Sequence, residues 1–228
     1  MKPKDLKCPF KWDTRQPLIH DGVVFVPTHY DKHHEWVFPD FSDKQLFGND
    51  QPVFIEYCSG NGDWVTDRAL RFSECNWIAV EKRFDRVRKI WSKLKNQKLS
   101  NLLVICGDAM TFSQFYLPAQ SVQEIFVNFP DPWPKRSHAK HRLIQPFFIE
   151  ECARVVRKGG KATLVTDDKD YSHQMIHTMG ASQHWQSCLA EPYYSTEWPQ
   201  YGSSFFEALW RSKGCEIFYH QFERVISL

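Results

Sequence analysis

Residues 53–62 read Val-Phe-Ile-Glu-Tyr-Cys-Ser-Gly-Asn-Gly, an apolar run that ends at Glu56 and passes into a glycine-rich turn. A helical pattern follows near 64–72. A strand, a glycine turn and a helix in this order are typical of a nucleotide-binding βα unit. A dinucleotide fingerprint carries a third glycine for close helix packing, but that position here is Val65. The turn therefore predicts a loop that approaches a ligand without cradling a pyrophosphate. A plain βα turn is the alternative.

Apolar runs continue to alternate with helical patterns after this unit. The expected strands lie at 77–80, 102–106, 125–127, 161–166 and 215–222. The expected helices lie at 84–94, from Pro146 to a stop at Gly159 and Gly160, and over a shorter stretch beyond Tyr171. Strands that alternate with helices predict an α/β fold with a doubly wound, mostly parallel sheet and right-handed crossovers.

Each of the first five strands ends at a carboxylate. In such sheets ligands sit outside the carboxyl ends of the strands. Five acids at corresponding positions therefore outline a site, and they are Glu56, Glu81, Asp108, Asp131 and Asp167.

The fourth strand leads into residues 128–135, which read Asn-Phe-Pro-Asp-Pro-Trp-Pro-Lys. Proline cannot donate to a strand ladder or continue a helix, so the backbone must leave the strand in a stiff loop. Asp131 and Trp133 are expected at the tip of that loop. A rigid acidic and aromatic loop beside cations suits a nucleobase carried on a polyanion.

Local alternatives remain open for three of the acids. Glu81 falls where a carboxylate grips ribose hydroxyls in doubly wound folds, and a solvent-exposed strand cap is the alternative. Asp108 could accept a hydrogen bond from an adenine amino group or form an Asx turn. Asp167 could cap the next helix, or Asp168 could do so instead.

Basic residues follow the proline loop. Four fixed cations fall within residues 135–142, and phosphate contact is the favoured interpretation over a solvated face. The cluster consists of Lys135, Arg136, His138, Lys140, His141 and Arg142. The His138 and His141 spacing is a weak zinc signal without further ligands, so no metal is expected.

Composition sets broad limits. The chain has 228 residues, 42% hydrophobic residues and a formal net charge of only +2, so a polyanion must be met by a local patch. Seven scattered cysteines without a CxxC pair predict neither a disulfide framework nor structural zinc. The first residues lack the apolar core of a signal peptide, and no apolar stretch is long enough to span a membrane. A cytoplasmic protein is expected.

The length of the chain predicts one domain with a small N-terminal appendage. Residues 1–50 are rich in Pro, His, Lys and Asp and predict an irregular N-terminal arm, with a short strand at 23–26. Residues 51–228 are expected to form the α/β domain.

Together these motifs resemble the tRNA (guanine-N(7)-)-methyltransferase family. The resemblance covers about residues 50–226. The family's E-I-G-x-G-x-G segment corresponds to residues 56–62, and its F-P-D-P-W-x-K motif matches residues 129–135 at every defined position. Arg142 to Ile144, Lys158 to Gly160 and Val165 to Asp167 also fit family motifs.

The resemblance implies a Rossmann-like class I methyltransferase fold with an antiparallel C-terminal strand. It implies that S-adenosylmethionine donates a methyl group to N-7 of a guanine in the variable loop of tRNA, forming 7-methylguanosine. Asp131 is implied as the catalytic aspartate. The implied cofactor residues are Glu56, Gly60, Gly62, Glu81, Asp108 and Asp131. The implied substrate residues are Lys135, Asp167, Ser204, Phe205, Phe206 and Glu207.

Three positions depart from the family pattern. Cys58 replaces the first glycine of the loop, which can alter the local backbone. Ser204 replaces a threonine, and Phe205 stands where a cation is common. The rival functions are a non-catalytic RNA-binding relative, a methyltransferase for another base and a dinucleotide oxidoreductase. The sequence predicts no membrane partner and leaves open whether the protein is a monomer or a homodimer.

Overall fold

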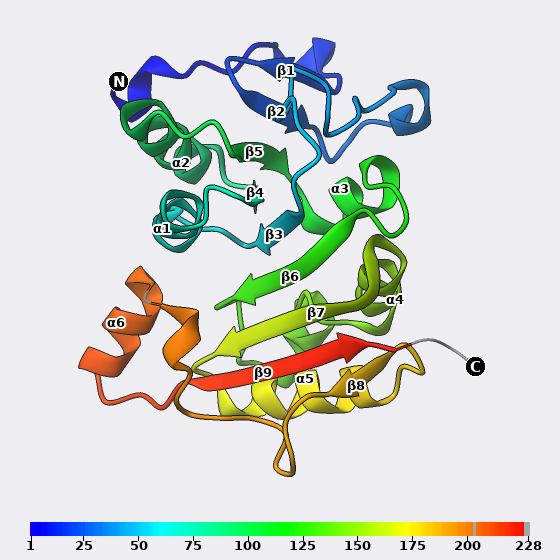
Figure 1. Cartoon of the computed structure of the whole chain (residues 1–228), viewed down its shortest axis with the longest axis vertical. Coiled ribbons are helices and arrows are strands. Elements are labelled where there is room, and N and C mark those ends of the chain that lie inside the picture. Colours follow the sequence, from blue (N-terminus) through cyan, green and yellow to red (C-terminus); the bar gives the residue numbers. More distant parts are fainter. Residues whose placement is uncertain (203, 226–228) are drawn as a thin grey trace. The chain divides into compact units, whose positions relative to one another are not determined.

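Strands and helices alternate along the chain in the computed structural model, which describes residues 1–202 and 204–225, apart from the side chains of Trp12 and Arg136 (Figure 1). The chain divides into two units, Met1–Leu117 and Pro118–Leu228. The expected boundary near residue 50 stays a prediction.

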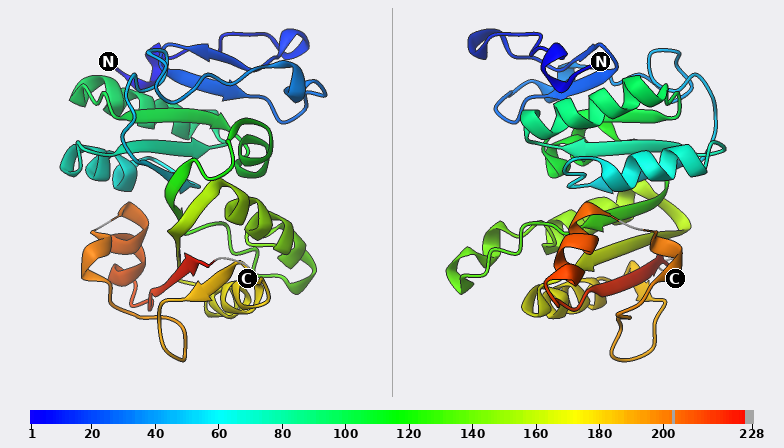
Figure 2. Two further views of the ribbon diagram at one scale, coloured as in Figure 1. Left: turned by 45° about the vertical axis from the view of Figure 1, so that its right-hand side comes forward. Right: turned by 90° about the vertical axis from the view of Figure 1, so that its left-hand side faces the viewer.

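The first unit contains five strands in the order β1-β2-β5-β4-β3. β2, β5, β4 and β3 run parallel, and β1 pairs antiparallel with β2. α1 and α2 lie on one side of these strands and α3 on the other (Figure 2). The bounds are η1 Pro3–Asp5, η2 Trp12–Thr14, β1 Leu18–His20, β2 Val23–Val26, η3 His33–Glu35, β3 Val53–Tyr57, α1 Asp63–Arg71, β4 Asn76–Glu81, α2 Phe84–Gln97, β5 Leu102–Gly107 and α3 Ala109–Tyr116.

Burial explains why these segments form strands and helices. Every residue of β4 is buried, as expected for a parallel strand covered on both faces. The helix predicted at 84–94 is confirmed as α2, in which Val87, Trp91 and Leu94 recur at helical spacing on the buried face. The strand predicted at 23–26 is also confirmed as β2, which is buried throughout.

Aromatic packing orders part of the N-terminal segment. His33 is buried, stacks on Phe115 and has its Nδ1 hydrogen-bonded to the hydroxyl of Tyr116 in α3. Trp36 and Phe38 also pack edge-on or tilted against Tyr116. Burial lowers the pKa of His33. Many of the chain's aromatic residues therefore serve as core.

The second unit contains four strands in the order β6-β7-β9-β8. β6 and β7 are parallel, and β9 pairs antiparallel with both β7 and β8. The expected antiparallel C-terminal strand is therefore confirmed. The bounds are β6 Val122–Asn128, η4 Arg136–His141, α4 Pro146–Val155, β7 Val156–Thr166, α5 Lys169–Gly180, β8 Trp185–Ser187, η5 Pro199–Tyr201, α6 Phe205–Ser212 and β9 Phe218–Arg224.

The predicted end of α4 is wrong. The helix begins at Pro146 as expected, but it ends at Val155, and Gly159 and Gly160 lie inside β7. The register between β6 and β7 shifts at this point, and Gly159 has a φ of 72°. A Cβ on Gly160 would lie 2.5 Å from the carbonyl oxygen of Gln123. The two glycines therefore permit a strand irregularity with close backbone approach, and they do not cap the helix.

His220 is a fully buried polar residue in the core of the second unit. Its Nε2 lies 3.1 Å from Ser172 Oγ, and its Nδ1 lies 3.1 Å from the carbonyl oxygen of Tyr193. Burial is the main cause that lowers the pKa of His220 from 6.5 to about 4. The folded protein therefore holds this imidazole neutral at pH values where the unfolded chain would protonate it.

The stability of the protein should therefore fall as the pH drops from 6.5 toward 4. Above pH 6.5 both states are neutral at this site, whereas below it the unfolded state binds a proton first. The loss from this group is up to about 3 kcal/mol. Urea unfolding at several pH values would measure it. His220→Gln should flatten the dependence, whereas His20→Gln at an exposed site should leave it unchanged. An unaltered slope in His220→Gln would contradict this account.

Candidate functional site

The glycine-rich turn of the first unit joins β3 to α1. The backbone N–H of Ser59 donates to the Val80 carbonyl at 3.1 Å, and that of Gly62 donates to the Ser59 carbonyl at 2.8 Å. Gly60 and Gly62 have φ values of 55° and 75°. A Cβ on Gly62 would lie 2.7 Å from Ile90 Cγ1. Gly62 is therefore required both by its backbone conformation and by the close approach of α2.

Cys58 occupies a left-handed backbone conformation, with a φ of 61°. Non-glycine residues rarely adopt it, because the Cβ crowds the backbone. The position thus has the conformation that a glycine would adopt easily, although a cysteine stands there. The turn therefore forms with a cysteine at this position, and the backbone of Cys58 is strained as a result.

Glu81 holds the glycine turn directly. It is 5% exposed, and its Oε2 accepts a hydrogen bond from the N–H of Gly60 at 2.9 Å. Its Oε1 accepts from the N–H of Arg83 at 2.8 Å, and the guanidinium of Arg86 lies 3.7 Å from Oε2. Glu81 is therefore an acceptor held in a fixed orientation at the end of β4, and the alternative of a solvent-exposed strand cap is wrong.

Asp108 begins α3. Its Oδ1 accepts hydrogen bonds from the N–H groups of Met110 and Thr111 at 3.0 and 3.1 Å. The local capping alternative is thus confirmed for this oxygen. Both backbone bonds end on Oδ1, so the cap leaves the second oxygen for a ligand. Contact with an adenine amino group stays a prediction.

The three acids of the first unit lie at one edge of its sheet. Glu56 is buried in β3, and the parallel pairing of β3, β4 and β5 sets Glu56, Glu81 and Asp108 at the carboxyl ends of adjoining strands. The predicted convergence is confirmed for these three residues. The arrangement offers fixed carboxylate acceptors to a ligand with hydroxyl and amino groups.

Two lysines that the sequence did not indicate also hold the glycine turn. Lys89 Nζ donates to Asn61 Oδ1 at 3.1 Å, and Lys93 Nζ donates to the Asn61 carbonyl at 2.9 Å. Lys93 also pairs with Asp63 at 2.6 Å. Their spacing of one helical turn was the available signal, since residues four apart share a helix face.

In the second unit, residues 129–135 leave β6 without helix or strand structure. The Phe129 N–H donates to the Val165 carbonyl at 2.9 Å, and Pro130 is buried. Phe129 and Trp133 have φ values of 48° and 44°. Asp131 and Trp133 are exposed, so the predicted presentation of these two side chains is confirmed.

Arg142 does not belong with the exposed cations, and this part of the sequence-based prediction is wrong. Its side chain is 8% exposed. Nε donates to the Pro132 carbonyl at 2.6 Å, Nη1 donates to Gln174 Oε1 at 2.7 Å, and the guanidinium lies 4.8 Å from the Tyr171 ring centre. A buried guanidinium needs such partners. Arg142 therefore braces the proline loop from its buried side.

The other basic residues of this segment are accessible to different degrees. Lys135, Lys140 and His141 are exposed and His138 is partly exposed, whereas the side chain of Arg136 lies outside the described part. The Trp133 ring lies 5.9 Å from that of His138 and 5.3 Å from that of His141. Trp133 thus buttresses the loop against η4. Within the described residues, no group of three or more His, Cys, Asp or Glu could hold a metal ion.

Asp168, rather than Asp167, caps α5. Asp168 Oδ1 accepts from the Tyr171 N–H at 2.7 Å. Asp167 is half-buried directly after β7, and burial is the main cause that raises its pKa. β7 runs parallel to β6, so Asp167 lies at the edge of the sheet from which the proline loop departs.

The remaining predicted substrate residues begin α6. Ser204 Oγ caps the helix by accepting from the Glu207 N–H at 3.1 Å. Glu207 Oε1 accepts from the Tyr219 hydroxyl at 2.5 Å and from Arg211 Nε at 3.3 Å. The Phe206 ring lies 6.3 Å from the Phe129 ring, whereas Phe205 is exposed. The structure thus places the start of α6 beside the base of the proline loop.

Known proteins resemble this chain over nearly all of its length. Residues 50–220 match the model of a family described as "Putative methyltransferase". A protein of Chlamydia felis named tRNA (guanine-N(7)-)-methyltransferase is 53% identical over 222 residues, which cover 97% of each chain. Its namesake from Chlamydia muridarum is 50% identical over 228 residues, covering 100% of each.

Solved structures show a similar fold at low sequence identity. The 16S rRNA methyltransferase KamB has a TM-score of 0.61 at 16% identity, covering 84% of this chain and 96% of its own. Phosphoethanolamine N-methyltransferase 2 of Haemonchus contortus, in complex with S-adenosyl-L-methionine, has a TM-score of 0.52 at 12% identity. That alignment covers 80% of this chain and 50% of the other.

Replacing Cys58 by glycine should stabilise the protein. Glycine adopts positive φ without Cβ strain, so Cys58→Gly should raise the free energy of unfolding by about 1 kcal/mol. Urea unfolding monitored by tryptophan fluorescence would measure the change. Cys58→Ala keeps a Cβ and should bring no gain. Equal stability of the glycine and alanine variants would show that strain at this position is negligible.

Removing Arg142 should destabilise the protein by about 2–4 kcal/mol. Arg142→Ala leaves the Pro132 carbonyl and Gln174 Oε1 without their donor at a part-buried place. Lys140→Ala, a cation of the same segment that makes no such buried contacts, should change stability by less than about 0.5 kcal/mol. Similar urea midpoints for the two variants would rule out the bracing role.

Proposed function

Because the chain belongs to the tRNA (guanine-N(7)-)-methyltransferase family, we propose that it transfers a methyl group from S-adenosylmethionine to N-7 of a guanine in the variable loop of tRNA. The product would be 7-methylguanosine. The single structural observation that supports this most is the exposed Asp131 at the tip of a loop braced by buried Arg142. The Rossmann-like class I methyltransferase fold provides the framework.

The acids of the first unit fit S-adenosylmethionine. Its ribose hydroxyls and its amino groups need hydrogen-bond acceptors, and Glu56, Glu81 and Asp108 provide them from one sheet edge. Both oxygens of Glu81 are already oriented by backbone N–H groups, which reduces the entropy cost of binding. Gly60 donates its N–H to Glu81, and Gly62 lets the turn pack closely against Ile90 of α2, so the two glycines hold the turn in place beside these acids. The cofactor supplies an electrophilic methyl group on a sulfonium.

Asp131 would orient the guanine and balance its charge. N-7 already carries a lone pair, so no strong base is needed to generate the nucleophile. The difficulty is alignment, which can account for several kcal/mol of the barrier. Methylation also moves positive charge onto the purine, and a fixed carboxylate stabilises that charge as it develops. Asp131 can in addition accept hydrogen bonds from the guanine edge or from the cofactor.

Residues of the second unit would bind the substrate in two ways. Lys135 and Phe205 are exposed and Asp167 is half-exposed, so these side chains are suited to direct contact. Ser204 and Glu207 are engaged in capping α6 and in bonding Tyr219. Their contribution would be to hold Phe205 and Phe206 in place.

The alternatives are a non-catalytic RNA-binding relative and a methyltransferase for another nucleic-acid base. Cys58 is the observation that favours the first, yet Gly60 and Glu81 still form their hydrogen bond beside it. Calorimetric binding of S-adenosylmethionine would separate a catalyst from a non-catalytic relative. A loop that binds an exocyclic amine would have an Asn or Asp followed by two prolines and an aromatic residue. The order Asn128-Phe129-Pro130-Asp131 breaks that pattern and disfavours a methyltransferase for an amino group.

We propose the reducing cytoplasm as the location of the protein. Nothing among the helices of the described residues has the length and apolar character that a membrane crossing requires. A tRNA substrate is consistent with this compartment.

Asp131→Ala should abolish methyl transfer, and Asp131→Asn should lower kcat by about 10²–10³-fold because it removes the balancing charge. The assay incubates the protein with labelled S-adenosylmethionine and total tRNA and identifies the modified nucleoside. Asp170→Asn, an exposed acid on α5, is the matched control and should retain turnover. Full activity of Asp131→Ala would refute its role, and absence of 7-methylguanosine with the unaltered protein would refute the function.

A further inference from the structure

Positive charge is concentrated on one part of the first unit. Residues 1–7 and 82–98 carry eleven Lys and Arg against two Asp, whereas the rest of the chain carries 18 Lys and Arg against 25 Asp and Glu. The net charge of +2 therefore conceals a strongly basic part and an acidic remainder. We call residues 1–7 together with 82–98 the cationic face.

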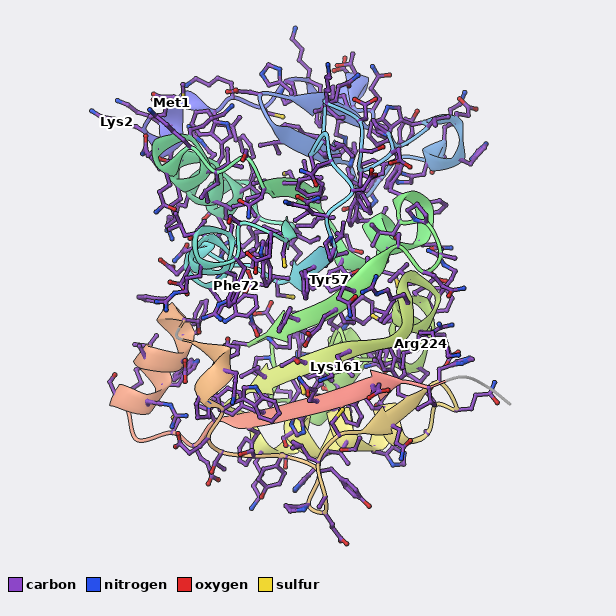
Figure 3. All side chains as sticks on the ribbon, in the orientation of Figure 1. Met1, Lys2, Tyr57, Phe72, Lys161 and Arg224 are labelled. Atoms are coloured by element: carbon purple, nitrogen blue, oxygen red, sulfur yellow. The ribbon has the colours of Figure 1, made fainter. Side chains whose placement is uncertain are left out.

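The structure brings the two segments of the cationic face together. The Met1 carbonyl accepts from Ser92 Oγ at 2.7 Å and from Asn96 Nδ2 at 2.9 Å. Arg88 Nε donates to the Pro3 carbonyl at 2.8 Å, and Leu6 is 1% exposed. Figure 3 shows Met1 and Lys2 at the outer edge of this unit, beside α2. The N-terminal lysines thus project from an anchored segment.

Some cations of this face are already neutralised. Arg83 pairs with Asp85, Arg86 with Glu81, Lys93 with Asp63 and Lys95 with Asp21. By contrast, Lys2, Lys4, Lys7, Lys82 and Lys98 are exposed and lie in no ion pair within the part of the chain that the structure describes. These five ammonium groups remain available to an external anion.

Gathering like charges has an electrostatic cost, which an anionic partner offsets. We propose that the cationic face binds the sugar-phosphate backbone of tRNA, through contacts separate from those of residues 131–142. The inference rests on the proposed function for its choice of polyanion. A phosphate chain suits exposed ammonium groups, because each phosphate that a lysine neutralises releases counterions.

A lipid surface is the less suitable occupant. Binding at a membrane interface combines basic residues with several exposed apolar side chains. Leu6, the apolar residue between these lysines, is turned into the protein, and Met1 is the one large hydrophobic residue of the face that is strongly exposed among those described. The face therefore offers charge without an apolar surface to insert.

The test compares Lys4→Glu/Lys7→Glu with Arg157→Glu/Lys158→Glu. The control has the same charge change at exposed residues of β7, away from the carboxyl end of that strand. Binding of full-length tRNA and of a short hairpin carrying the target guanine is measured at several salt concentrations. Binding to anionic vesicles, methyl transfer and S-adenosylmethionine affinity are measured alongside.

The Lys4→Glu/Lys7→Glu variant, called the face variant, should bind full-length tRNA roughly tenfold more weakly. The slope of log affinity against log salt concentration should become smaller in magnitude by about one for each phosphate that the variant no longer neutralises. Hairpin binding, kcat and cofactor affinity should stay unchanged, and the control should behave as the unaltered protein. Equal weakening in the face variant and the control, or equal weakening on tRNA and hairpin, would overturn the proposal. Unchanged tRNA binding together with abolished binding to anionic vesicles would assign the face to lipid. Because binding is measured directly, the result holds even if no methylation occurs.

Discussion

The parallel pairing of β3, β4 and β5 is the constraint on which the first unit depends. It forces the ends of three strands to one edge and thereby gathers Glu56, Glu81 and Asp108 there. The Glu81 carboxylate then fixes the glycine turn through the Gly60 N–H. The parallel pairing of β6 and β7 has the same effect in the second unit, where the proline loop and Asp167 leave one edge. Topology thus places the acids, and hydrogen bonds fix their orientation.

Most strands of the sheet and the acids at their ends could be predicted from the sequence, because the end of a buried strand is visible as a change from apolar to polar residues. Apolar runs that stop at an acid indicated β3, β4, β5 and β7 and the positions of their carboxylates. Short elements were less predictable: β1, β8, α3 and α6 have no counterpart among the predictions, since three to eight residues show little periodicity. Gly159 and Gly160 led to a wrong prediction for the end of α4, because glycine occurs both at helix ends and at strand irregularities.

In the basic segment after the proline loop, the sequence does not reveal which cations are buried. Composition counts Arg142 and Lys140 as equal cations, yet one is buried under the Pro132 carbonyl and the other is accessible to solvent. Only tertiary contacts distinguish them. The same holds for Lys89 and Lys93, whose spacing marks a helix face but not its neighbour, Asn61. Residues that position a site are therefore harder to predict than residues that form it.

Lys89 connects the basic residues of α2 with the glycine turn. It lies on α2 among the basic residues, and its ammonium group donates to Asn61 in the glycine turn. An anion that draws this ammonium group away must weaken its bond to the turn, and a ligand that tightens the turn must weaken the pull of the anion. Thermodynamic linkage makes these two effects equal in free energy. The single bond between Lys89 and Asn61 thus gives the two kinds of ligand a route to negative cooperativity.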